Sequence, residues 1–450
     1  MIYTLKEIKE IIKKDREEKQ GKYYARQYYN YKPNKLFPDM SLTYNKDIVD
    51  GNGEVVTITK ERLPWVNTNY TKLLVNQKVD YMLANEPTID NIPDKYTIVE
   101  IADMLENITL TASLDVTSWL FLYVKDNLLN WVLIPDSQIK PIYDDFGKDI
   151  KEIIRYYEIK NTTFVEIWTL DGVQQLSYKS ENNIDILLND RFQSHYKVEK
   201  GYNNELVNVE AKNLPFIPFI PMNNNKNMEN DIDCVKDQID FYNIIKSGLV
   251  GNVFKFQEML MKLQGFTGDE EFYDQTMKKM QKYKMIGLPD SETNAEYMAV
   301  DIPIEAREML LTALKENIFK IGQGMDPDKI GDGNITNIVI KNRYSALDMK
   351  SNKTIKQTKL FYKKFIDCIN LFYRTAYKPD ITFNKSVNWN ESEIIDNCVK
   401  SMDIIPDEII IEHHPWITDI KKALKIMEEQ KQNKIDDFNN NMSNNNNNVE

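Results

Sequence analysis

The sequence has few cysteines and histidines for a chain of 450 residues. Its three cysteines, Cys234, Cys368 and Cys398, are far apart and odd in number, which argues against a disulfide framework and for a reducing compartment. Only three histidines occur, so the sequence contains few residues that could form a catalytic triad or a histidine-based metal centre. The adjacent His413 and His414 could bind zinc only with partners from elsewhere, and we favour a role in helix capping or packing.

Common enzyme motifs and long apolar runs are absent as well. The sequence contains neither a P-loop nor a three-glycine dinucleotide-binding motif. Its longest apolar blocks, such as 119–124, are far too short to cross a bilayer, and its first residues do not resemble a leader segment. We therefore expect a soluble, intracellular protein that is not an enzyme, has no membrane partner, and needs no cofactor and no metal.

The sequence has fewer basic than acidic residues. It contains 57 lysines and arginines and 69 acidic residues, which gives a formal net charge of -12. Proteins that grip nucleic acid neutralise phosphates with basic side chains, so tight DNA binding is disfavoured. Five tyrosines between positions 23 and 31 are interleaved with basic residues, a pattern compatible with stacking on single-stranded nucleic acid. Packing of an aromatic strip is the interpretation that we favour.

The most regular pattern lies between positions 301 and 374, where two helical segments flank a loop. Apolar residues recur every three or four positions in the first segment and predict an amphipathic helix of about 20 residues. These residues are Ala306, Met309, Leu310, Ala313, Leu314, Ile318 and Ile321. Gly322 and Gly324 end this helix. After a polar, glycine-rich loop the period resumes over 338–374 and predicts a longer helix, with a bend near Ser351.

Other regions predict one more long helix and a sheet. The longest helical stripe runs from Ile232 to Leu260, with Asp231 favouring its start through the helix dipole. Short aromatic and β-branched runs between 119 and 169, separated by turn residues, predict an antiparallel sheet. The proline-rich stretch 214–221 predicts an extended edge segment at a domain boundary. The fold class that follows is α+β and rich in helix.

Two short patterns resemble metal sites. Asp136 after a proline, followed by Glu158 and Lys160, matches the minimal pattern of a metal-dependent nuclease core, which arises often by chance in so charged a chain. Asp326 and Asp328 stand at positions one and three of a calcium-loop pattern. Position twelve of that pattern is Asn337 instead of a bidentate glutamate, so we do not predict calcium binding.

The order of these parts resembles the portal proteins of long-tailed bacteriophages, particularly those of phages with Gram-positive hosts. The resemblance rests on Tyr23-Tyr24, 76–83, 217–225, 235–243, and 331–334 followed by 343–347. It implies a ring of identical subunits, commonly twelve, at one capsid vertex, with a central channel for packaging and ejection of viral DNA. The implied partners are the major capsid and scaffolding proteins, the terminase packaging motor, the head-tail connector and the double-stranded DNA in the channel. The implied location is the virion, after assembly in the host cytoplasm.

The resemblance also implies a portal-like architecture with an α/β wing, two long stem helices, a small α/β clip insertion and a helical crown. The expected parts are the wing region 1–228, first stem helix 229–262, clip 263–302, second stem helix 303–324, tunnel loop 325–337, long bent helix and remaining wing 338–400, and crown 401–432. The asparagine-rich tail 433–450 is predicted to be disordered.

Two groups of candidate functional residues follow from this assignment. The tunnel-loop residues expected to touch DNA are Asp326, Asp328, Lys329, Gly331, Asp332, Gly333 and Asn334. Their glycines permit unusual backbone geometry and their acids repel phosphates, so the contact should yield as DNA slides. The residues expected to pack the stem are Ile239, Tyr242, Ile245, Leu249 and Val253. The alternatives are another virion structural protein of the tail or baseplate, and a metal-dependent nuclease.

Overall fold

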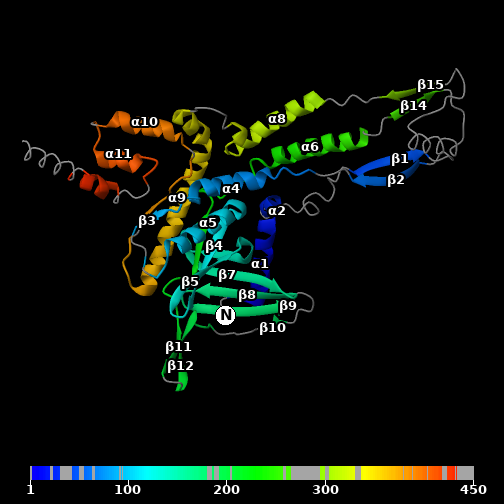
Figure 1. Cartoon of the computed structure of the whole chain (residues 1–450). Helices are drawn as coiled ribbons and strands as arrows, with labels where there is room; N and C mark the ends of the chain where they lie inside the picture. Colours follow the sequence, from blue (N-terminus) through cyan, green and yellow to red (C-terminus); the bar gives the residue numbers. More distant parts are fainter. Residues whose placement is uncertain are drawn as a thin grey trace, which may run out of the picture.

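Figure 1 shows the computed structural model, in which both helices and antiparallel strands occur. It describes residues 3–20, 24–30, 43–49, 55–62, 66–90, 93, 95–179, 185–186, 192–202, 205–256, 260–264, 294–298, 304–329, 336–378, 380–387, 389–402, 404–417, 423–430 and 432. The predicted class of a mixed helix and sheet fold is confirmed. The division into wing, stem, clip and crown stays a prediction. No helix in these ranges is long and apolar enough to span a membrane.

The first helix covers a five-stranded antiparallel sheet. The elements are α1 (Leu5–Gln20), β6 (Ile139–Tyr143), β7 (Ile150–Ile159), β8 (Thr162–Thr169), β9 (Gly172–Lys179) and β10 (Asp185–Ile186), with strand order β10-β9-β8-β7-β6. Ile8 and Ile12 lie one helical turn apart on α1 and are buried against Ile154 and Val165 of the sheet. The apolar period of α1 and the predicted sheet thus meet in one core.

A second sheet contains the proline-rich segment. Its strands are β4 (Thr117–Lys125), β5 (Leu128–Ile134) and β13 (Phe219–Asn223), in the order β13-β4-β5. The extended edge segment was therefore predicted correctly, and Pro221, opposite Trp119, sits on an edge strand where a missing N–H is tolerated. The expected boundary is wrong, because Phe216 and Ile220 are buried in the largest core.

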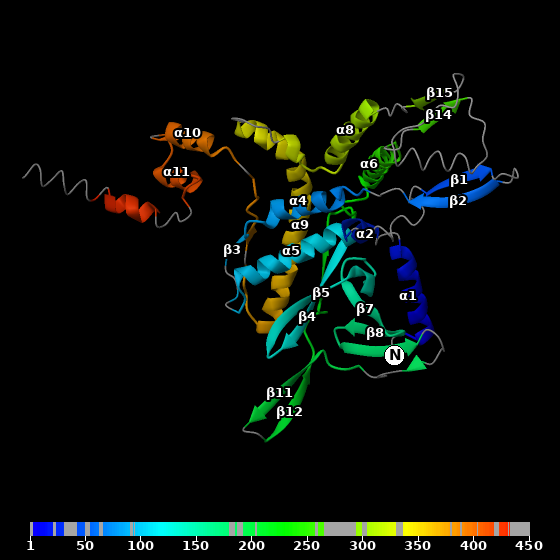
Figure 2. The ribbon, with the colours of Figure 1, turned by 45° about the vertical axis from the view of Figure 1, so that its right-hand side comes forward.

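Three helices pack around this second sheet. They are α4 (Tyr70–Leu83), α5 (Ile98–Asp115) and α9 (Asn337–Tyr373). A capping box between Thr97 and Glu100 starts α5, which ends at Asp115. Phe361 and Phe365 of α9 are buried in the shared core. The ribbon of α9 changes direction along its length in Figure 2, as the predicted bend requires.

Two further helices, α6 (Lys236–Phe256) and α8 (Ile304–Ile321), lie side by side away from the sheets (Figures 1 and 2). The prediction for α8 was close, but α6 begins four residues later than the apolar stripe suggested. Beyond these helices β14 (Leu260–Gln264) pairs with β15 (Asn294–Met298), while the rest of the predicted insertion lies outside the described residues.

Smaller elements complete the described fold. The hairpin of β11 (Tyr196–Tyr202) and β12 (Glu205–Lys212) projects from the body in both views (Figures 1 and 2). The remaining elements are α2 (Tyr24–Asn30), β1 (Thr43–Val49) paired with β2 (Val55–Arg62), β3 (Thr88–Ile89) paired with β16 (Ile381–Thr382), the 3-10 turns η1 (Asp136–Gln138) and η2 (Pro327–Lys329), α10 (Glu391–Ser401) and α11 (Asp407–His413). The tail 433–450 lies outside the described residues.

Candidate functional site

Helix α4 lies where α6, α8 and α9 come together. Leu74 of α4 is buried in one cluster with Ile239 of α6 and Ile318 of α8. A Cβ atom on Gly324 would lie 2.3 Å from Cδ2 of Leu74, and one on Gly322 would lie 2.8 Å from Cδ1 of Leu74. The glycines after α8 therefore also let the chain pass directly over α4, beyond their predicted part in ending the helix.

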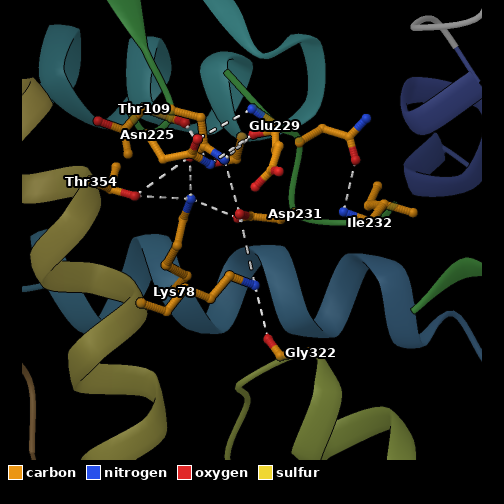
Figure 3. Close-up of polar contacts among 12 residues, drawn as sticks. Lys78, Thr109, Asn225, Glu229, Asp231, Ile232, Gly322 and Thr354 are labelled. Carbon is orange, nitrogen blue, oxygen red and sulfur yellow. Dashed lines mark hydrogen bonds and ion pairs between the residues drawn. The ribbon is translucent and has the colours of Figure 1, made fainter. Parts of the chain in front are cut away.

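A buried ionic network surrounds Lys78 of α4 (Figure 3). The Lys78 side chain is fully buried, and its Nζ lies 2.6 Å from Oδ2 of Asp231 and 2.6 Å from Oδ1 of Asn224. Lys350 of α9 places its Nζ 3.8 Å from the other carboxylate oxygen of Asp231 and donates a hydrogen bond of 2.9 Å to the carbonyl oxygen of Gly322. These five residues, the Lys78 network, join α4, α9, the segment before α6 and the end of α8.

For both Lys78 and Asp231, burial and the opposite charges nearby shift the pKa in opposite directions. Burial lowers the pKa of Lys78 below that of free lysine, although Asp231 opposes the shift. Burial would raise the pKa of the Asp231 carboxyl, but Lys350 and Lys78 outweigh it, so its pKa lies below the usual value. Asn224 also donates to Asp231. A charge pair so enclosed is costly to break, which makes the network a rigid junction.

Sequence reasoning missed this network. Asp231 was predicted to favour the start of a helix through the helix dipole, but that helix begins only at Lys236, and Asp231 is instead buried beside Lys78. One signal was present in the sequence. Lys78 falls four residues after Leu74 and four before Met82, within the apolar stripe of its helix. A lysine at such a position indicates a buried charge with a partner elsewhere.

The start of the predicted tunnel loop is folded onto α4 and α8. Lys315 of α8 forms ion pairs with both Asp326 and Asp328. The side chain of Asp326 is only 8% exposed, whereas that of Asp328 is 77% exposed. The hydrogen bond from Lys315 to Asp328 raises the pKa of Lys315. The charge of Asp326 is thus balanced locally, so Asp328 is the more accessible of these two acids.

The other predicted tunnel-loop residues cannot be placed. The side chain of Lys329 and the residues Gly331, Asp332, Gly333 and Asn334 lie outside the described part of the chain. The loop assignment itself stays a prediction.

The predicted stem residues fall into three groups. Ile239 and Tyr242 are buried between α6 and α8. Ile245 and Leu249 are half-buried, and the side chain of Val253 lies outside the described residues. Their place in a ring stays a prediction. On α8 the predicted apolar face is only partly covered, because Ile318 is buried while Met309 is 73% exposed.

The nuclease-like pattern and the histidine pair form no cluster of metal ligands in the described part of the chain. Asp136 accepts a hydrogen bond of 2.8 Å from Nε1 of Trp119 and lies 3.6 Å from Nζ of Lys19, while Glu158 is exposed. Among the described residues no group of three or more potential metal ligands occurs. His413 bonds to the carbonyl oxygen of Ile409 within its own helix.

The tyrosine strip belongs to the packing of the fold where it is described. The Tyr28 hydroxyl donates to the carboxylate of Asp240 on α6, at 2.7 and 2.9 Å from its two oxygens. Tyr29 donates to Asn76 on α4. Arg26 pairs with Asp115 at the end of α5. These contacts support the packing interpretation over stacking on nucleic acid, and Tyr23 and Tyr31 lie outside the described residues.

Comparison with known proteins gives a consistent result. The model of the family described as "Phage portal protein, SPP1 Gp6-like" matches residues 8–437. The portal protein of Clostridium phage phiCD119 is 26% identical over 480 aligned positions, covering 97% of this chain and 99% of that protein. The portal protein of Bacillus phage SPP1 is 24% identical over 399 positions, covering 80% of this chain and 74% of that protein.

Solved structures similar over much of the chain include a chain of "Neck of empty GTA particle computed with C6 symmetry". It has 9% sequence identity and a TM-score of 0.45, and the match covers 78% of this chain and 91% of that chain.

Proposed function

Since the chain belongs to the phage portal protein family of the SPP1 Gp6-like type, we propose that it assembles into a ring of twelve copies at one vertex of a capsid. Its function is that of a portal protein, a structural virion component through whose ring DNA is packaged and ejected. The observation that carries this conclusion is the match of the family model to nearly the whole chain, from residue 8 to 437.

Exposed apolar side chains on the paired helices support ring formation. Met309 and Leu310 of α8 and Phe241 of α6 all lie on the surface of the single chain. Large apolar side chains that are exposed on a single chain can be covered by a neighbouring copy in an assembly. In the proposed ring, neighbouring copies cover these side chains, while Ile239 and Ile318 hold the two helices of each copy together.

The finer assignment follows the portal architecture. The paired helices α6 and α8 form the stem, the region that includes β14 and β15 forms the clip, and α11 with the residues after it forms the crown. The terminase motor and later the head-tail connector dock on the clip, while capsid and scaffolding proteins surround the wing. The segment 325–337 faces the DNA. The chain itself has no catalytic activity, in keeping with a family that is structural.

Electron microscopy of the purified protein tests the ring. We expect ring-shaped particles with a central hole and twelve-fold symmetry. Monomers, filaments or solid particles under all assembly conditions would instead favour a tail or baseplate component. A ring of a different copy number would correct only the count.

Two loop variants test the channel-facing segment. Gly331→Pro with Gly333→Pro should leave rings intact and reduce DNA packaging in vitro, because proline removes the backbone freedom of both glycines. Asp328→Lys should raise the affinity of the ring for DNA and its salt dependence, by about 0.9 in logarithmic slope for each phosphate neutralised. Lys72→Met, on the exposed side of α4, is the control for a change of charge away from the segment. Normal packaging and unchanged binding would remove 325–337 from the channel.

A further inference from the structure

The segment 325–337 is held at each end by an amide side chain that bonds both backbone groups of a single residue. At the first end, the Met325 N–H donates to Oε1 of Gln77, and Nε2 of Gln77 donates to the Met325 carbonyl oxygen, both at 2.8 Å. At the second end, the Asn390 N–H donates to Oδ1 of Asn337 at 2.7 Å, and Nδ2 of Asn337 donates to the Asn390 carbonyl oxygen at 3.3 Å.

The chemistry of these pairs suits a side-chain amide. Asparagine and glutamine carry a carbonyl acceptor and an NH₂ donor next to each other on one planar group, which matches the N–H and C=O of a single backbone residue. Met325 is 7% exposed, so its backbone groups would be costly to leave without partners. The absence of a side chain at Gly324 lets the backbone approach Gln77 closely, because a Cβ atom there would lie 3.0 Å from Oε1 of Gln77.

The two ends are attached to different parts of the molecule. Gln77 precedes Lys78, so the first end is fixed beside the Lys78 network, which joins α4 to α9, to the segment before α6 and to the end of α8. At the second end Glu393, in the first turn of α10, also accepts the Asn337 N–H at 2.6 Å. Each attachment therefore joins the segment to a helix distant in sequence.

We propose that Gln77 and Asn337 are positioning residues that fix the two ends of the segment 325–337, the first on α4 and the second on α10. Each of these two ends is thereby attached to a helix outside the segment. The proposal rests on the proposed function only where it names this segment as the part that faces DNA. The attachments themselves are independent of that role.

Hydrogen exchange measured by NMR or mass spectrometry on the whole protein tests each attachment. Gln77→Met removes both hydrogen bonds to Met325 at nearly constant side-chain length, and each neutral bond favours the closed state by about five-fold, so exchange of the Met325 amide should rise about 25-fold. Gln77→Glu keeps the acceptor and loses the donor, so the rise should be about five-fold. Gln27→Met, at an exposed glutamine of α2, should leave the Met325 amide unchanged.

The second end provides an internal control. Asn337→Leu should accelerate exchange of the Asn390 amide and leave Met325 protected, while Gln77→Met should do the reverse. If the Met325 amide exchanges at the wild-type rate in both Gln77 variants, the first attachment is refuted, and an unchanged Asn390 amide in Asn337→Leu refutes the second. Should Gln77→Met fail to fold, Gln77→Glu decides the first end alone.

DNA packaging by rings of the same variants separates this proposal from the proposed function. Faster exchange at Met325 with intact rings and reduced packaging supports both. Faster exchange with normal packaging keeps Gln77 as a positioning residue and removes 325–337 from the DNA path. Rings of wild-type number and shape in the microscope show that assembly is not the step affected.

Discussion

Replacing Lys78 by methionine is the most informative single perturbation of the junction between α4, α6, α8 and α9. Methionine follows the course of the lysine stem without its charge, so the packing around Leu74 and Met82 is preserved. The Asp231 carboxylate, whose side chain is 5% exposed, then loses the cation at 2.6 Å. Oδ1 of Asn224 loses its closest donor as well.

The expected loss in the free energy of unfolding depends on the contacts that Asp231 keeps in the variant. Removing one partner of a buried ion pair costs about 3–5 kcal/mol, because the other charge stays buried. Lys350 still lies 3.8 Å from Asp231, and Asn224 still donates to it, so we expect the lower end of that range, about 3 kcal/mol. The double variant Lys78→Met with Asp231→Asn removes the uncompensated charge. Its loss of stability should be about 1–2 kcal/mol smaller than the sum of the losses in the two single variants.

Chemical denaturation of the unassembled protein, followed by tryptophan fluorescence, measures these free energies. The matched control is Lys72→Met, an exposed lysine on the same helix, for which a change within about 0.5 kcal/mol is expected. If Lys78→Met and Lys72→Met destabilise the protein equally, the Lys78 network does not act as a rigid junction. An additive double variant would show that Lys78 and Asp231 do not interact.

Two further predictions concern the hairpin and the paired helices. Burial lowers the pKa of His195, whose Nδ1 accepts the Leu214 N–H at 2.9 Å, so the unfolded chain takes up the proton first as the pH falls below about 6.5. The free energy of unfolding should therefore drop below that pH, and His195→Asn should remove this part of the pH dependence. A His195 NMR signal that titrates at the pH of free histidine would contradict the lowered pKa. Leu249→Asp places a carboxylate on the half-buried side of α6. It should abolish rings in gel filtration and microscopy while the single chain stays folded. Stable rings of this variant would disprove the stem assignment.

Local patterns were sufficient for much of the secondary structure. The apolar period between 306 and 321 predicted α8 almost to the residue, and the short β-branched runs between 119 and 169 predicted strands, which the structure divides between two antiparallel sheets. The proline-rich segment was recognised as an edge strand because proline cannot donate a ladder hydrogen bond. Each inference depends on neighbours within a turn or a strand, so sequence alone contains the information.

The order of the parts along the chain is also sufficient to recognise the family. That recognition does not depend on a catalytic motif. It depends on stretches distributed from residue 20 to 400, a range that lies within the match of the family model to residues 8–437.

The polar contacts that hold the long helices together were decided only by the tertiary structure. The sequence places Lys78 on an apolar stripe and Asp231 near a helix start, but Lys78 and its partner Asn224 are 146 residues apart. Gln77 and Met325 are separated by 248 residues. Periodicity indicates which face of a helix is buried. It contains no information on which distant carboxylate or carbonyl group will lie against that face, since this depends on how the packed helices cross.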